Sequence, residues 1–275
     1  MSMSDASPRR WSEMAWPEIG AALAAEPEVG LVPVGAIEQH GPHLPTGTDT
    51  IVASALCDRA GARSDALVMP PISLGCSFGH GTAFPGTLSL SPEILIAVVR
   101  QYAEWSATSG LTRLLFVNAH MGNSPALLSA TDHLRLLRPD LQTGIVNWWE
   151  ASPAVTAQTV TDAEDLHANR AETSLMLAVA PELVRLDELA GADDPDRTED
   201  LVFRYNASSL STNGVTGRPS EATRELGEEL LEAVVAEIAA RAQRGRAEEP
   251  PLGRAGTTSF TSLQGPIPRR EESRR

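Results

Sequence analysis

The segment VGAIEQHGPHLPTGTDT, residues 34–50, contains four side chains that can bind a metal ion. Glu38 and Asp49 supply carboxylates, while His40 and His43 supply imidazoles. The segment otherwise has the pattern of a buried strand that runs into a Gly/Pro loop. Imidazole combined with carboxylate oxygen suits Zn, Mn or Fe(II). The segment therefore indicates a metal site, although EQH alone is as easily a polar turn. His43 is expected only to support the site, because His-Gly-Pro-His cannot easily aim both rings at one centre.

The other histidines follow the same arrangement. Only His133 lies within a helical pattern, and the five in expected loops are His40, His43, His80, His120 and His167. A carboxylate can bridge two ions about 3.5–4 Å apart, as in two-metal hydrolytic sites. A single histidine after a strand is nevertheless more often a hydrogen-bonded loop residue than a ligand. The spacing alone leaves both interpretations open for the set Glu38, His40, Asp49 and His120.

Short apolar runs alternate with longer helical patterns along the chain, which predicts βα units around a mostly parallel sheet. We therefore predict an α/β layered fold. The expected strands are residues 30–37, 65–75, 111–120 and 143–151, and the expected helices are residues 50–62, 91–110, 123–140 and 171–184, followed by a long final helix. Residues 1–245 are expected to form one domain. Residues 246–275 are rich in Pro, Gly and charge and are expected to be a disordered tail.

Unusual polar and aromatic residues lie at the ends of the expected strands. They are Ser77 and His80 after the second strand, Asn118 and His120 at the end of the third, Trp148, Trp149 and Glu150 at the end of the fourth, and His167 and Glu172 before a later helix. Ligands of parallel α/β sheets bind outside the carboxyl ends of the strands. We therefore expect these residues to meet at one edge of the sheet. For the Trp pair, a substrate-lining wall and simple core packing are equally good explanations.

The composition argues against several classes of protein. The 275 residues carry a formal charge of −14, and the sequence contains no Lys. Such a surface repels nucleic-acid phosphates and anionic membranes, and no run approaches the about 20 apolar residues of a membrane span. Cys57 and Cys76 fit no disulfide or CxxC pattern. We therefore expect a cytoplasmic protein without nucleic-acid or membrane partners. The Gly-rich stretch at 79–92 lacks the spacing and the Lys of a P-loop, so we do not expect it to bind a nucleotide.

Five blocks of the sequence resemble the creatininase family of metal-dependent amidohydrolases. They are PVGAIEQHGPHLPTGTD, GCSFGHGTAFPGTLSL, FVNAHMGN, HANRAETS and NGVTGRPSEAT, in the family's order, between residues 32 and 223. The resemblance implies a three-layer α/β/α sandwich, two divalent ions (Zn, Mn or Fe(II)) and a homo-oligomer, frequently a hexamer. By the same resemblance, Glu38 and His120 hold one ion and His40 the other, with Asp49 as the bridge.

One ligand of the creatinine-hydrolysing members is missing. They have a Glu where this chain has Gly122, so the resemblance does not extend to creatinine as the substrate. Glu172, in the block HANRAETS, is the carboxylate expected to complete the second metal site and to take part in catalysis.

The resemblance implies hydrolysis of a small-molecule amide. The leading hypothesis is attack of a metal-activated water on a non-peptide or cyclic C–N amide. His167 is expected to shuttle the proton to the departing nitrogen, and Ser77, His80 and Trp148 or Trp149 to contact the substrate. The alternatives are a peptidase that trims a ribosomally made redox-cofactor precursor of the mycofactocin type, and a deformylase acting on formamidopyrimidines. A non-catalytic binding protein with the same fold is an alternative from another class.

Overall fold

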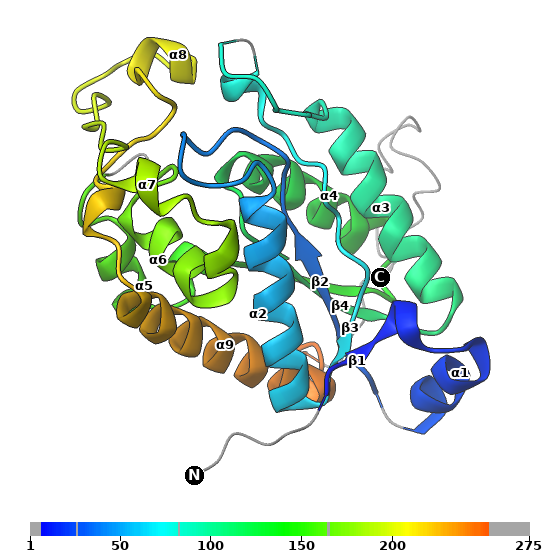
Figure 1. Cartoon of the computed structure of the whole chain (residues 1–275). Helices are drawn as coiled ribbons and strands as arrows, with labels where there is room; N and C mark the ends of the chain where they lie inside the picture. The colour runs from blue at the N-terminus through cyan, green and yellow to red at the C-terminus, as the bar shows by residue number, and fades with distance from the viewer. Residues whose placement is uncertain (1–6, 26, 82, 164–165, 253–275) are drawn as a thin grey trace, which may run out of the picture.

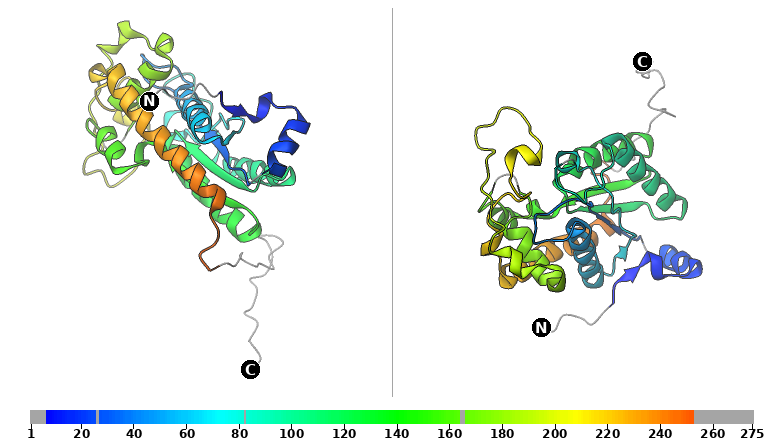
Figure 2. Two further views of the ribbon diagram at one scale, coloured as in Figure 1. Left: turned by 90° about the horizontal axis from the view of Figure 1, so that it is seen from below. Right: turned by 45° about the horizontal axis from the view of Figure 1, so that its top comes forward.

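The computed structural model describes residues 7–25, 27–81, 83–163 and 166–252. Within these residues, a five-stranded sheet has the order β1-β3-β2-β4-β5, and every pair of neighbours is parallel. The strands are β1 (Arg9–Arg10), β2 (Gly30–Val34), β3 (Leu67–Val68), β4 (Arg113–Asn118) and β5 (Gln142–Asn147). Helices cover both faces of the sheet (Figures 1 and 2). The predicted α/β/α sandwich is confirmed.

The helices divide into two groups around the sheet. On one face, α2 (Thr48–Ser64), α6 (Arg170–Val179) and α9 (Arg224–Ala247) pack against one another, and on the other face α3 (Pro92–Thr108) packs against α4 (Ser124–Leu137). The shorter helices are α1 (Trp16–Ala25), α5 (Pro153–Thr159), α7 (Leu186–Leu189) and α8 (Ala207–Leu210). Single 3-10 turns lie at Trp11–Glu13, Phe78–His80, Met121–Asn123, Trp148–Glu150, Pro181–Leu183 and Pro219–Glu221.

Each face of the sheet packs into its own apolar core, because side chains along a strand alternate between the two faces. In β4, Leu115 and Val117 pack with residues of α2, α6 and α9, while Leu114 and Phe116 pack with residues of α3 and α4. Successive side chains of a strand point to opposite faces, so a sheet covered on both faces needs a continuous apolar run. Complete burial of a side chain such as Phe116 contributes roughly 1.5–3 kcal/mol.

The carboxyl ends of three strands lie at one level. The register pairs the last residue of β2 with Asn118 of β4, and Asn118 with Asn147 of β5, whose side chains are joined by a hydrogen bond of 2.9 Å. Asn123 ties in two further loops, because its Nδ2 donates to the Gly35 carbonyl and its Oδ1 accepts from the Cys76 amide, both at 2.9 Å. The loops after β2, β3 and β4 thus form one platform.

Some predicted boundaries are wrong. The strand expected over residues 65–75 is only Leu67–Val68 long, because Pro70 and Pro71 have no N–H to donate to a ladder, although one bridge joins Val34 to Ile72. The elements β1, α1 and α5 were not predicted. Helix α9 continues to Ala247. Residues 253–275 of the expected tail lie outside the described residues.

Candidate metal centre

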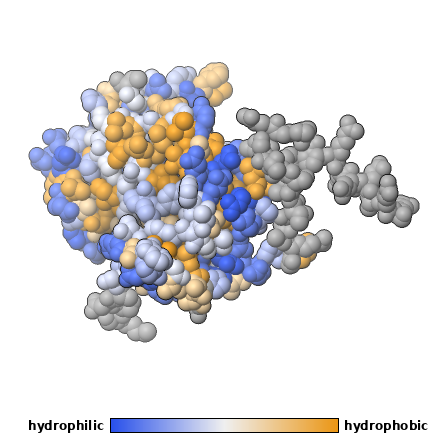
Figure 3. All heavy atoms as spheres, turned by 90° about the vertical axis from the view of Figure 1, so that its right-hand side faces the viewer, coloured by the Kyte–Doolittle hydropathy of each residue, from blue (hydrophilic) through white to orange (hydrophobic). Residues whose placement is uncertain are grey.

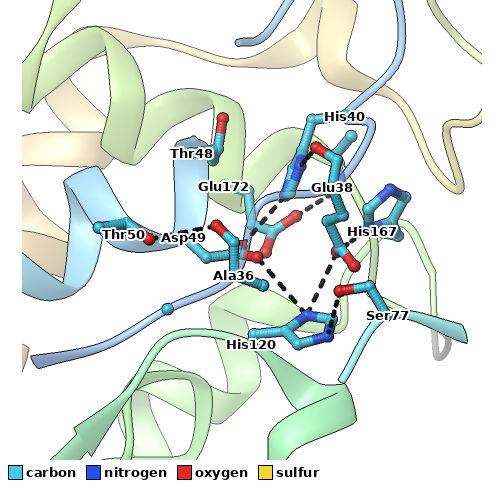
Figure 4. Close-up of polar contacts among 12 residues, drawn as sticks. Ala36, Glu38, His40, Thr48, Asp49, Thr50, Ser77, His120, His167 and Glu172 are labelled. Atoms are coloured by element: carbon cyan, nitrogen blue, oxygen red, sulfur yellow. Dashed lines mark hydrogen bonds and ion pairs between the residues drawn. The ribbon is translucent and has the colours of Figure 1, made fainter. Parts of the chain in front are cut away.

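Five side chains from four segments converge at the carboxyl edge of the sheet (Figure 4). Glu38 and His40 lie on the loop after β2, Asp49 in the first turn of α2, His120 two residues after the end of β4, and Glu172 in the first turn of α6. All five are buried. Since β2 ends before Glu38, the loop, rather than alternation along a strand, brings Glu38 and His40 together.

The potential ligand atoms form three groups; two of them share the Asp49 carboxylate, and the other consists of Glu38, His40 and His167. In one of the two that share Asp49, Glu38, Asp49 and His120 each offer one ligand atom within 4.8 Å of the others. A second group of the same size consists of His40, Asp49 and Glu172. Asp49 is common to both, as a bridging carboxylate would be.

Backbone carbonyls orient the two imidazoles toward the carboxylates. A carbonyl only accepts, so His40 Nδ1 donates to the Glu38 carbonyl at 3.2 Å, and its Nε2 is left 3.1 Å from Asp49 Oδ1. His120 Nε2 donates to the Cys76 carbonyl at 2.9 Å, and its Nδ1 lies 3.2 Å from Glu38 Oε1. Metal-binding histidines typically donate their second nitrogen in this way, which fixes the ring and its tautomer.

Several atoms of the cluster have no hydrogen-bond partner. They are both carboxylate oxygens of Glu38, Nε2 of His40 and Oδ2 of Asp49, all inaccessible to solvent. A buried polar atom without a partner is costly, and a carboxylate still more so. Divalent cations held by these atoms would satisfy them, so the residues fit metal binding.

Burial and the charges within the cluster shift the pKa values of its own side chains. Burial is the largest single effect on His40 and lowers its pKa, but the carboxylates of Asp49, Glu172 and Glu38 together outweigh burial and raise the pKa of His40 to about 10. The pKa of His120 rises to about 9, because burial is outweighed by the Glu38 and Asp49 carboxylates together with the Cys76 carbonyl. Burial raises the pKa of Glu172 to about 7 despite the opposing charge of His40. Without a cation, the cluster therefore takes up protons.

Metal binding is accordingly expected to release protons and to tighten as the pH rises. With pKa values of about 10 and about 9, His40 and His120 both carry a proton at pH 7 that must leave before the ring nitrogen can bind an ion. The apparent Zn²⁺ affinity should rise about tenfold per pH unit for each displaced proton. Calorimetric titration in two buffers of different ionisation enthalpy measures the release. Equal heats in both buffers would contradict it.

Glu172 is held in place by the start of α6. The Asn169 side chain caps the helix by accepting from the amides of Ala171 and Glu172 at 3.0 and 3.1 Å. Glu172 Oε2 accepts from the amide of Ala168. Ala168 has φ 51°, in the left-handed region that a non-glycine residue rarely adopts. This strained turn lies between His167 and Glu172, so it orients both residues.

Gly122 leaves no space for a side chain. A Cβ at this position would lie 2.2 Å from the Cys76 carbonyl oxygen and 2.5 Å from His120 Nε2. The backbone here therefore does not accommodate a carboxylate at position 122, whereas Glu172 reaches the cluster from the first turn of α6 (Figure 4).

His167, His80 and Ser77 border the cluster. His167 Nδ1 lies 3.5 Å from Glu38 Oε1, and His80 Nε2 lies 3.8 Å from Glu38 Oε2. Burial lowers the pKa of His80 and holds that of His167 well below its usual range, so both rings are neutral. Ser77 Oγ lies 3.3 Å from His120 Nε2. The structure thus brings His167 and His80 beside Glu38, and Ser77 beside His120.

Gln39 joins the site, although the sequence analysis gave it no role. Its side-chain Nε2 lies 2.9 Å from His167 Nε2, 3.1 Å from His80 Nδ1 and 2.8 Å from the Gly214 carbonyl oxygen. These partners are up to 175 residues away in sequence. Its only local signal was its position between two expected ligands.

The remaining candidates belong to none of the groups of potential metal ligands among the described residues. Trp148 is 1% exposed and packs in the core, with the Trp149 ring edge-on at a centroid distance of 6.3 Å. This burial favours core packing for Trp148, while Trp149 is half-buried. The His43 ring bonds through Nε2 with Thr173 Oγ1 at 2.8 Å, as expected of a supporting residue. His133 is half-buried within α4.

A buried aspartate organises the segment that carries Gly214. Asp194 Oδ2 accepts from the Thr212 amide and from the hydroxyl of Ser211, and its Oδ1 pairs with Arg197 at 2.6 Å. Burial would raise the pKa of Asp194, but these donors outweigh burial and lower it to about 2.

Replacing Asp194 by Asn should lower the free energy of unfolding at pH 7 by about 2 kcal/mol, as expected for hydrogen bonds to a charged group. Because the folded pKa of about 2 is below the ordinary 3.8, this stabilisation is present above pH 3.8 and is lost as the pH falls through 2. Urea unfolding at pH 7 and pH 3 measures the difference. The control is Asp187→Asn, at an exposed position. A difference between Asp194→Asn and wild type that does not shrink at pH 3 would contradict the assignment.

Buried imidazole and carboxylate groups at the carboxyl edge of a parallel α/β/α sheet define a metal-dependent enzyme. The chain belongs to the creatininase family, whose sequence model, described as creatinine amidohydrolase, matches residues 12–242. It is accordingly a metal-dependent hydrolase, as the sequence predicted.

Relatives of two named activities share this family. The chain is 35% identical over 244 residues to the creatinine amidohydrolase of Pseudomonas putida, covering 82% of this chain and 93% of the relative. It is 37% identical over 223 residues to the mycofactocin precursor peptide peptidase of Mycolicibacterium smegmatis, covering 78% and 84%. A solved structure of a Mn creatininase superposes with a TM-score of 0.78 at 32% identity, covering 88% of this chain and 100% of that one.

Among the described residues, no helix combines the length and the apolar composition needed to cross a membrane.

Proposed function

We propose that the chain binds two divalent ions and hydrolyses a non-peptide or cyclic C–N amide bond of a small molecule. One ion would be held by Glu38, Asp49 and His120. The second would be held by His40, Asp49 and Glu172, so that Asp49 bridges the pair. The observation that carries the proposal is the set of buried carboxylate and imidazole atoms without hydrogen-bond partners.

The donor set fits several metals. Bound divalent ions supply Lewis-acid chemistry, because they lower the pKa of water and polarise a carbonyl oxygen. One related solved structure is a creatininase mutant of Zn–Zn type and another is the Mn form. Imidazole and carboxylate ligands accept Zn, Mn and Fe(II) with overlapping preference, so the residues here fit all three.

His167 would move the proton of the reaction. Its neutral ring lies beside Glu38, 3.5 Å from Nδ1 to Oε1. A neutral imidazole can accept a proton from the attacking water and deliver it to the departing nitrogen. His80, whose side chain is 19% exposed, and Ser77 would contact the substrate, and the half-buried Trp149 is the Trp we retain as a substrate-binding candidate.

A peptidase acting on a precursor peptide is the second candidate. The relative from Mycolicibacterium smegmatis bears that name and is 37% identical to this chain. The absence of space for a ligand at Gly122 also separates this site from the creatinine-hydrolysing pattern. The lack of space at Gly122 also supports Glu172 as the carboxylate of the second metal site, whichever of the two substrates is cleaved.

The test is a screen of cyclic amides, formamides and short peptides against protein reconstituted with Zn²⁺ or Mn²⁺. The matched control is Glu38→Ala, which should lose both bound metal and turnover. Turnover of a cyclic or non-peptide amide supports the proposal. Cleavage of peptides alone would favour the peptidase, and formate release alone would favour a deformylase. No bound ion and no turnover in protein purified without chelator would contradict hydrolysis and favour a binding protein.

We also propose a cytoplasmic homo-oligomer, a hexamer by resemblance. The two cysteines are buried and free, which fits a reducing compartment. Figure 3 shows hydrophobic patches on one face of the molecule. Separately, Trp16 of α1 is 84% exposed and Trp105 of α3 is 72% exposed. Exposed aromatic side chains of this kind are typical of interfaces. Light scattering that gives a monomer mass at micromolar concentration would contradict an oligomer.

A further inference from the structure

We propose that Gln39 is a positioning residue that presents His167 and His80 to the metal centre through opposite nitrogens. His167 would face it with a bare Nδ1, and His80 with a protonated Nε2. The catalytic roles of these two rings rest on the proposed hydrolysis, whereas their hydrogen bonds follow from the geometry alone.

The orientation of the Gln39 amide is set by the backbone. Its Oε1 accepts from the Gly41 amide at 3.0 Å, so its Nε2 points the other way. There Nε2 meets three neighbours: the Gly214 carbonyl oxygen at 2.8 Å, His167 Nε2 at 2.9 Å and His80 Nδ1 at 3.1 Å. An amide nitrogen has only two hydrogens, so one of the three neighbours receives none.

Two of the acceptors decide which neighbour is left out. The Gly214 carbonyl can only accept, so it takes one hydrogen of Gln39 Nε2. His167 Nε2 lies 2.9 Å from the backbone carbonyl of Gln39 itself, which also can only accept. If His167 Nε2 donates to that carbonyl, the second hydrogen of Gln39 goes to His80 Nδ1 and every group is paired. The opposite choice leaves the carbonyl of the buried Gln39 without a donor, and it also leaves the half-buried His80 Nδ1 without the Gln39 hydrogen.

In the arrangement in which every group is paired, His167 presents an acceptor nitrogen to Glu38 and His80 presents a donor nitrogen. His167 keeps a bare Nδ1, 3.5 Å from Glu38 Oε1, while His80 keeps a proton on Nε2, 3.8 Å from Glu38 Oε2. The ring centroids are 4.3 Å apart. One ring can therefore accept the proton of the nucleophile while the other donates a hydrogen bond to a substrate oxygen that gains charge.

The backbone at Gly214 packs closely against the side-chain amide of Gln39. A Cβ at Gly214 would lie 1.9 Å from Gln39 Oε1, and the residue has φ +84°, where glycine is favoured. The close approach of this backbone to the Gln39 side chain therefore depends on glycine.

The direct test is the tautomer of each ring in zinc-loaded wild-type protein, measured by ¹⁵N NMR of histidine-labelled samples. The expected result is a proton on Nε2 and none on Nδ1 for both His80 and His167. A proton on Nδ1 of either ring would overturn the assignment. Absence of turnover with any substrate would refute the proposed hydrolysis, yet the NMR result would still decide the role of Gln39.

Two variants separate positioning from simple structural support. Gln39→Glu has no hydrogen to donate, so His80 is expected to move its proton to Nδ1. Gln39→Met should lower kcat about 10- to 100-fold while KM stays within about twofold and the zinc content is unchanged. The matched control is Gln142→Met. Gln142 is the first residue of β5, at the end of the strand away from the carboxyl edge, and its side-chain Nε2 donates to the exposed Glu248 carbonyl. Unchanged kcat in Gln39→Met, or an unchanged His80 tautomer in Gln39→Glu, would overturn the proposal.

Discussion

Replacing Glu172 by Gln is expected to leave a folded protein that retains one tightly bound ion instead of two. The amide keeps the size of the side chain but removes the charge that the second ion requires beside His40 and Asp49. Activity should fall at least about 10³-fold, which corresponds to about 4 kcal/mol of transition-state stabilisation. Metal analysis after gel filtration and steady-state kinetics measure the two effects.

Glu182→Gln is the matched control, because this residue lies ten positions further along at an exposed site. It should leave metal content and activity unchanged. Two ions and full activity in Glu172→Gln would show that another group completes the second site.

Replacing Gly122 by Ala should damage the site without removing any ligand. The added Cβ would lie 2.2 Å from the Cys76 carbonyl oxygen and 2.5 Å from His120 Nε2, so the His120 ring and its loop must shift. Overpacking of this kind costs about 1–3 kcal/mol of stability, and a ligand displaced by about 1 Å can cost about 10²-fold in rate. Thermal unfolding and kcat/KM measure both.

Gly79→Ala tests the same change in a neighbouring loop where a Cβ has open space within 4 Å, and it should have little effect on stability. For the same steric reason, Gly122→Glu should not rescue Glu172→Gln. Normal stability and metal content in Gly122→Ala would contradict the account of this loop.

The layers of the fold were predictable because buried strands and amphipathic helices leave strong local patterns. The runs around Leu31 and Phe116 are apolar on both faces, as central parallel strands must be. By contrast, β1 contains only Arg9–Arg10, which pair with Leu67–Val68. A two-residue strand has no periodicity, so its position depends on tertiary contacts.

The candidate site was predictable to the extent that its residues lie near strand ends. His120 lies two residues after the end of β4, and because the strand ends are aligned, the sheet itself brings the residues that follow them together. The role of Gln39 could not be predicted in this way, since its partners His167 and Gly214 lie 128 and 175 residues away. The packing of Trp148 was equally hidden, because an aromatic residue after a strand can face either the core or a pocket.

The most direct test of the two-ion centre is anomalous diffraction from crystals of protein purified without chelator, recorded at the absorption edge of the bound metal. We expect two peaks per chain, one contacted by Glu38, Asp49 and His120 and one by His40, Asp49 and Glu172. A single peak, or none, would contradict the account.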